Sequence, residues 1–138
     1  MNNYLIFRVT AWWAGIYHLA LGLIGIFADK EFMSLVIQTV FGASVEITPQ
    51  VFYLVKFCSA YMTAFAVATI ILAMNPVKYR SLIWVPLTLF IIRLLQRVLF
   101  YSTLAASFDI PARTESITII ALIIMPTLLY LSRPKVSS

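Results

Sequence analysis

Four long apolar stretches dominate this chain and decide most of what it can fold into. They cover about residues 5–27, 51–74, 82–101 and 116–131 of a sequence of 138 residues. A helix needs about 20 mostly apolar residues to cross about 30 Å of membrane hydrocarbon, and the stretches are close to that length. The sequence therefore predicts an all-α integral membrane protein, a bundle of four transmembrane helices that forms a single domain over residues 1–138.

The composition favours lipid rather than water as the surroundings of the chain. Hydrophobic residues make up 62% of the sequence and charged residues 11%, whereas a soluble domain has roughly 45–50% apolar and about 25% charged residues. A chain this short cannot bury the excess in a core of its own, because small domains bury only about two-thirds of their surface. A soluble protein enclosed in a larger assembly would share this composition but would not explain where the charges fall.

The charged residues beside the four stretches indicate which way the chain crosses the membrane. One side receives most of the basic residues, namely Arg8, Lys78, Arg80, Arg133 and Lys135. The other side receives two basic residues and all five acids, namely Lys30, Arg113, Asp29, Glu31, Glu46, Asp109 and Glu115. Because basic residues accumulate on the cytoplasmic side, both termini are predicted to be cytoplasmic.

The first outer loop contains an apolar segment, 32–41, that is too short to span. It ends at Gly42, a residue typical of helix ends. The segment predicts a short amphipathic helix at the outer interface or over the mouth of the bundle. The polar segment 102–115 is expected to lie beside it.

The net charge of +5 does not come from any run of lysine and arginine. We therefore attribute it to membrane topology and to contacts with lipid headgroups, and expect no nucleic-acid partner. The expected partners are the lipid bilayer and other membrane protein subunits. The first stretch has no clear cleavage site at its end and is interpreted as a retained helix. The single cysteine, Cys58, excludes an internal disulfide.

Several polar side chains lie inside the predicted spans, where an Arg or Lys costs roughly 2.5–3.5 kcal/mol at a helix centre. The candidate ligand-binding residues are His18, Lys56, Arg93, Gln96 and Arg97. Two interpretations compete. In the structural one, the cations reach headgroups, backbone carbonyls or loop acids. In the functional one, they bind an anionic or carbonyl-bearing ligand such as a quinone ring, a lipid phosphate or an acid substrate.

Small residues on the first two spans predict close contacts between helices. The first span carries Ala11, Ala14, Gly15, Gly22 and Gly25 around His18, and the second carries Ser59, Thr63 and Ala66 in line with Lys56. If these faces and that of Arg93 all turn inward, they form a basic cleft open to the outer side. Asp109 and Glu115 are the expected counter-charges, since they lie nearest to Arg97 in the sequence.

His18, the only histidine, has two sets of roles open to it. It could be the single axial ligand of a haem or of a chlorophyll-type pigment, or hydrogen-bond a quinone carbonyl. Alternatively it makes an interhelical hydrogen bond that is purely structural. Bis-histidine haem ligation within the chain is excluded. The sequence shows no phosphate-binding loop, nucleophile elbow or metal-spaced Cys/His set, so no catalytic residue and no metal ligand is predicted.

The order of these features resembles the DoxX-like group of small four-helix membrane proteins. The resemblance covers roughly residues 8–105 and is carried by Tyr17-His18-Leu19-Ala20-Leu21-Gly22-Leu23, Asp29, Lys56, Tyr61, Asn75-Pro76 and Arg93. Some DoxX-like proteins are linked to quinone-coupled sulfur oxidation, so the resemblance implies a quinone as a ligand. No catalytic residue of that group can be placed on this sequence.

Three functions are therefore expected, all in the bacterial cytoplasmic membrane. The first is a non-catalytic accessory subunit of a respiratory or photosynthetic electron-transfer complex. The second is a DoxX-like redox protein with a quinone in the outer cleft. The third is a subunit that binds a pigment or a haem through His18.

Overall fold

The computed structural model describes residues 3–134, apart from the side chain of Ala105, and these residues form helices and connecting loops without any strand. The predicted flank residue Lys135 lies outside the described residues. The elements follow one another as α1 (Asn3–Phe27), α2 (Lys30–Phe41), α3 (Pro49–Met74), the 3₁₀ helix η1 (Arg80–Ile83), α4 (Trp84–Leu99), α5 (Tyr101–Phe108) and α6 (Ala112–Leu131).

Four segments of the described chain are helices long and apolar enough to cross a membrane. They are α1, α3, η1 together with α4 (Arg80–Leu99), and α6. The prediction of an all-helical chain with four spanning helices is confirmed, and the chain is a multi-pass membrane protein by this criterion.

Capping residues set the ends of the helices around the first loop. The side chain of Asp29 accepts a hydrogen bond from the backbone nitrogen of Phe32 at 2.8 Å, so α2 begins at Lys30. Gly42 ends α2 in the left-handed conformation, with φ of 64°, where glycine carries no steric penalty. Thr48 caps α3, whose first residue is Pro49, a favoured residue at that position.

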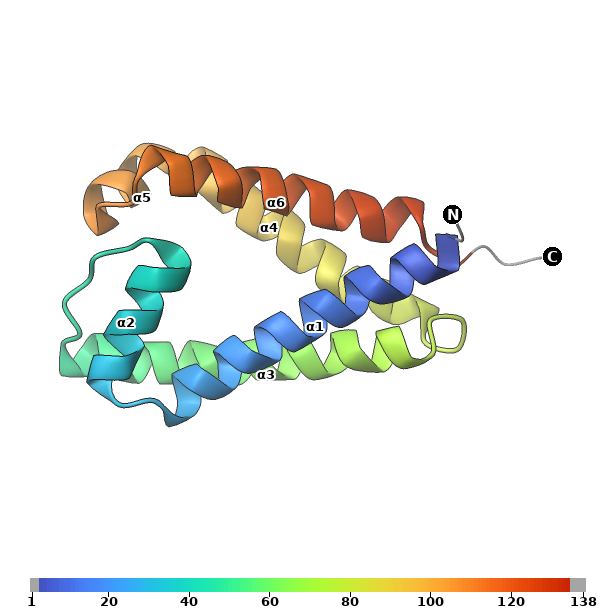
Figure 1. Ribbon diagram of the computed structural model, residues 1–138, viewed down its shortest axis with the longest axis horizontal. Helices are drawn as coiled ribbons and strands as arrows, with labels where there is room; N and C mark the ends of the chain where they lie inside the picture. The colour runs from blue at the N-terminus through green and yellow to red at the C-terminus, as the bar shows by residue number, and fades with distance from the viewer. Residues whose placement is uncertain (1–2, 135–138) are drawn as a thin grey trace.

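The helices are arranged as two antiparallel pairs, α1 with α3 and α4 with α6 (Figure 1). The pairs meet at the end that holds both termini, which we call the terminal end, and separate towards the opposite end. That opposite end, which we call the loop end, holds α2, the 42–48 loop and α5. The buried core lies in the half nearer the termini and includes Phe7, Leu72, Phe90, Leu122 and Leu129.

The predicted small-residue faces of the first two spans pack directly against each other. An ideal Cβ added to Gly25 would lie 1.9 Å from Ser59 Oγ, and one added to Gly22 would lie 3.0 Å from the backbone nitrogen of Thr63. Ala11 and Ala14 on α1 and Ala66 on α3 are fully buried. Small side chains allow this close approach, and it brings the two faces into direct contact.

The two loops at the loop end lie side by side, as expected for the polar 102–115 segment. The backbone nitrogen of Ser44 donates to the carbonyl of Phe108 at 2.9 Å. An ideal Cβ on Gly42 would lie 3.0 Å from Thr114 Cγ2, so the end of α2 touches the first turn of α6. These contacts connect the two helix pairs where they are furthest apart.

Candidate functional site

The structure distributes the predicted ligand-binding residues over four separate environments. His18 and Arg93 meet in the middle of the bundle, Arg97 pairs with Glu115, Lys56 binds the end of α1, and Gln96 is exposed. Three of these environments are internal contacts between helices.

His18 is 2% exposed and connects α1 to α4. Its Nδ1 lies 2.8 Å from the carbonyl oxygen of Ala14. Because a carbonyl only accepts, Nδ1 carries the proton and donates it there. Nε2 is then free to accept a long hydrogen bond from Arg93 Nη1, at 3.5 Å. The contact fixes the tautomer of the imidazole and supplies the interhelical hydrogen bond that the structural interpretation requires.

Aromatic rings enclose the imidazole of His18. The ring centroids of Phe65, Tyr17 and Phe90 lie 4.8, 5.3 and 5.9 Å from it, all in edge-to-face arrangements. Nε2, the atom that would bind a metal, faces the guanidinium of Arg93. The residues around His18 therefore do not fit the axial ligand of a haem or pigment, since a macrocycle needs open space beyond Nε2 and the cation there would repel a metal ion.

Arg97 on α4 forms an ion pair with Glu115 in the first turn of α6. The two side chains are 15% and 3% exposed, so the pair is shielded from its surroundings. The second carboxylate oxygen of Glu115, Oε1, is buried with no hydrogen-bond partner among the described residues. Of the two expected counter-charges, Glu115 is confirmed, whereas Asp109 is exposed and ends α5 in the left-handed conformation.

Lys56 caps the end of α1, and it does not line the predicted cleft. Its Nζ donates to the carbonyls of Ile26 at 2.5 Å and Ala28 at 3.3 Å, and lies 4.7 Å from the centroid of the Phe52 ring. The last carbonyls of a helix have no partner within the helix, and cations are favourable beside them. Arg8 of α1 makes the reciprocal contact, because its Nε donates to Ala73 near the end of α3 at 3.3 Å.

Replacing Lys56 by methionine is expected to lower the free energy of unfolding by about 1.5–3 kcal/mol, the range for hydrogen bonds to charged groups. Methionine keeps the apolar stem and removes the donor that satisfies the carbonyls of Ile26, in the last turn of α1, and of Ala28, just after it. Unfolding in mixed micelles, followed by circular dichroism during a titration with dodecyl sulfate, measures the change. Lys30→Met is the matched control, because Lys30 is exposed and makes no such bond with the described residues. Equal losses in both variants would contradict the capping role.

Gln96 lies on the outward face of α4 and is exposed, together with Leu95 and Leu99. Successive residues on a helix are about 100° apart, so Gln96 and Arg97 point in clearly different directions. The spacing of Arg93, Gln96 and Arg97 places all three within one broad face. The neighbouring helices partly bury the edge of this face that carries Arg93 and Arg97, and they leave the edge that carries Gln96 exposed.

Two apolar cavities lie side by side at the loop end, and sequence reasoning does not reveal them. The first, of about 370 Å³, is bounded by α2, the following loop, α3, α4, α5 and Ile110, and Arg97 is the one charged residue that lines it. The second, of about 270 Å³, lies between α1, α2 and α3. Both are lined by Ile37, Phe41, Leu54 and Val55, so the same α2 and α3 side chains form part of each wall.

The chemistry available at the first cavity is that of one guanidinium in an apolar wall. Within residues 3–134, no group of three or more His, Cys, Asp or Glu side chains is placed to hold a metal ion. A site of this kind suits a ligand with an apolar body and a polar, hydrogen-bond-accepting head. Comparisons with protein-family models, with curated proteins and with solved structures found no match, so the geometry of this chain carries the functional argument.

Proposed function

We propose that this chain is a small protein of the bacterial cytoplasmic membrane that binds a quinone-class ligand in the cavity at the loop end. The observation that carries the proposal is the apolar cavity of about 370 Å³ lined by Arg97. Its volume lies in the range of about 300–1,000 Å³ that is typical of small-molecule sites. Such sites combine apolar walls with a few polar groups that orient the ligand, as this one does.

Arg97 is the group proposed to orient the ligand. A guanidinium has five N–H donors and no acceptor, and the ion pair with Glu115 uses one nitrogen, Nη1. The remaining donors can serve a quinone carbonyl, while Glu115 balances the charge. The resemblance to DoxX-like proteins supports the same class of ligand. His18 and Arg93 take no part in this site, because they bind each other inside the bundle.

The proposal includes an orientation in which the terminal end is cytoplasmic and the loop end faces outward. Four described basic residues flank the terminal end, namely Arg8, Lys78, Arg80 and Arg133, whereas all five acids belong to the loop end. This distribution follows the positive-inside rule. In this orientation α2 is the interfacial helix, with Met33 buried against the bundle and Phe32 and Leu35 exposed.

Filling the cavity is expected to weaken quinone binding. Val55→Trp places a large ring in the shared wall of both cavities and is expected to reduce the affinity at least ~10-fold, equivalent to about 1.4 kcal/mol. The measurement is equilibrium binding of a radiolabelled short-chain ubiquinone to the protein in lipid nanodiscs. Arg97 and Glu115 stay intact in this variant, so the ion pair is not disturbed.

Val67→Trp on the same helix is the matched control, because Val67 is 46% exposed and lines neither cavity. It is expected to bind the quinone as the wild type does. Equal affinities of the two tryptophan variants would refute the site, and binding no greater than that of empty nanodiscs would refute the function.

An accessory subunit of a membrane electron-transfer complex is the second candidate, and the exposure of Gln96 favours it. An amide that faces outward among apolar side chains can be satisfied by hydrogen bonding to a helix of another subunit. Extraction in a mild detergent followed by native mass spectrometry tests this candidate. Recovery of the chain with no other protein would remove it.

A further inference from the structure

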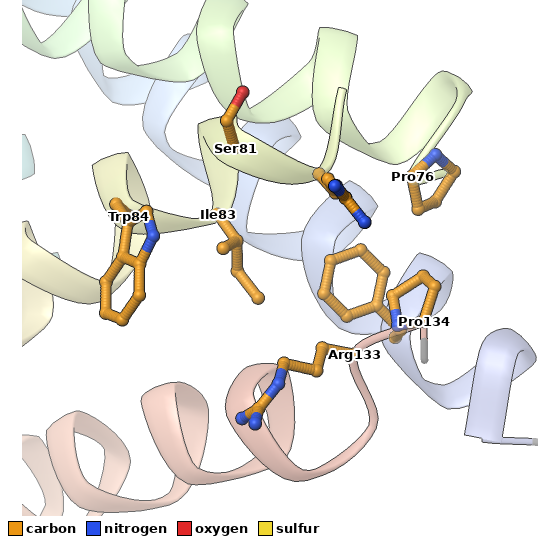
Figure 2. Close-up of a pocket in the computed structure, with 8 residues that line it drawn as sticks. Pro76, Ser81, Ile83, Trp84, Arg133 and Pro134 are labelled. Atoms are coloured by element: carbon orange, nitrogen blue, oxygen red, sulfur yellow. The ribbon is translucent and has the colours of Figure 1, made fainter. Parts of the chain in front are cut away.

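A third cavity, of about 520 Å³, lies at the terminal end, far from the proposed quinone site. Four segments line it: α1, the turn after α3, η1 with the first residue of α4, and the residues after α6. Its lining residues are Phe7, Pro76, Arg80, Ser81, Ile83, Trp84, Arg133 and Pro134. Figure 2 shows Ile83 and Trp84 on one side of the open space and the side chain of Arg133 on the other.

Two arginines supply the charge of this cavity, and both retain donors for a ligand. Arg133 Nη1 donates to the Tyr130 carbonyl at 3.0 Å, and its guanidinium carbon lies 3.7 Å from the centroid of the Tyr130 ring. These contacts orient the side chain and use one of its five donors. Arg80 is exposed, and its guanidinium makes no hydrogen bond and no ion pair with the described part of the chain.

No acidic side chain balances these cations. The chain has five acids, and all of them lie between the end of α1 and the start of α3 or between α5 and the first turn of α6, at the loop end. Arg8 and Lys78 add further positive charge at the terminal end. The cavity therefore combines guanidiniums that no acidic side chain balances with apolar walls formed by Phe7, Ile83 and Trp84.

We propose that this cavity binds the phosphodiester headgroup of an anionic phospholipid. Guanidiniums bind phosphate oxygens through paired, charge-assisted hydrogen bonds, which are stronger than those between neutral groups. The apolar walls favour a lipid over a free phosphate ion, because the glycerol and the first methylenes need apolar contact beside the charge. Trp84, 62% exposed, is an amphipathic ring of the kind that lies at the headgroup level of a membrane.

The test compares two double variants that remove the same charge. Arg80→Gln with Arg133→Gln empties the cavity of cations, and Lys78→Gln with Arg113→Gln removes two exposed cations that do not line it. The protein is solubilised in detergent with equal amounts of phosphatidylglycerol and phosphatidylcholine. Native mass spectrometry then measures the ratio of the two lipids that stay bound to it. The first variant is expected to lose about 10-fold or more of the preference, the loss expected when hydrogen bonds to a charged group are removed. The control variant is expected to keep most of it.

Three results would overturn the proposal. Equal losses in the two double variants would show general surface attraction, and an unchanged preference in the first would show that the cavity holds no headgroup. Displacement of the lipid by millimolar inorganic phosphate would show a site for the free anion instead. Arg80→Lys with Arg133→Lys is expected to restore part of the preference, which separates loss of charge from misfolding.

Discussion

Replacing Glu115 by alanine is expected to lower the free energy of unfolding by about 3–5 kcal/mol, the cost of breaking a buried ion pair by removing one partner. The substitution leaves Arg97 between α4 and α6 with no acid beside it. A cation in that position must either stay unpaired in a poorly solvated place or pull its helix outward. The measurement is unfolding by dodecyl sulfate in mixed micelles, followed by circular dichroism.

The paired replacement, Arg97→Met with Glu115→Leu, is the informative control. Exchange of a buried ion pair for apolar side chains of similar volume is often neutral or stabilising by about 1–4 kcal/mol. This variant is therefore expected to be at least as stable as the wild type. Glu46→Ala, at an exposed acid in a loop, is expected to change stability by less than about 0.5 kcal/mol. A Glu115→Ala variant as stable as Glu46→Ala would contradict the pairing seen in the structure.

The same paired variant also tests the proposed function. It removes the only guanidinium from the wall of the 370 Å³ cavity while keeping the bundle folded. If Arg97 orients the quinone head, this variant binds the quinone less tightly although it is stable. An undiminished affinity would show that the apolar wall alone selects the ligand.

The four spans could be predicted from the sequence because length and apolarity decide them without reference to any other part of the chain. The ends of α2 are also local, since Asp29 and Gly42 act within a few residues of themselves. The pairing of Arg97 with Glu115 could be predicted for a related reason. The two residues belong to consecutive spans, close to the short connection between them.

The roles of the other polar residues depend on how helices are rotated and how far their ends overlap, which the sequence does not state. Lys56 reaches the carbonyls of Ile26 and Ala28 only because α1 ends level with the second turn of α3. Gln96 is exposed because α4 turns Arg97 towards α6 instead. The 370 Å³ cavity has walls from α2, the following loop, α3, α4, α5 and Ile110, so no single stretch of sequence carries its pattern.

The close contact of α1 and α3 leads to the second large effect. Gly25→Ala is expected to cost about 1–3 kcal/mol, as overpacking does, because its Cβ would lie 1.9 Å from Ser59 Oγ and 2.8 Å from Ser59 Cβ. Gly22→Ala is expected to cost at least as much. Its Cβ would meet backbone atoms, the nitrogen of Thr63 at 3.0 Å and the carbonyl oxygen of Ser59 at 3.2 Å, besides Thr63 Oγ1 at 2.4 Å.

A second substitution distinguishes these two clashes. Ser59→Gly removes both atoms that oppose a Cβ at position 25, and the next contact, Val55 Cγ1 at 3.8 Å, is an ordinary one. Gly25→Ala should therefore be rescued in a double-mutant cycle, with a coupling energy of about 0.5–3 kcal/mol between neighbours. Thr63→Gly removes the hydroxyl opposite Gly22 but leaves the backbone contacts, so its rescue should be much smaller. Equal rescue at both positions would mean that α1 can move away from α3, and that the helix pair is not the rigid part of this bundle.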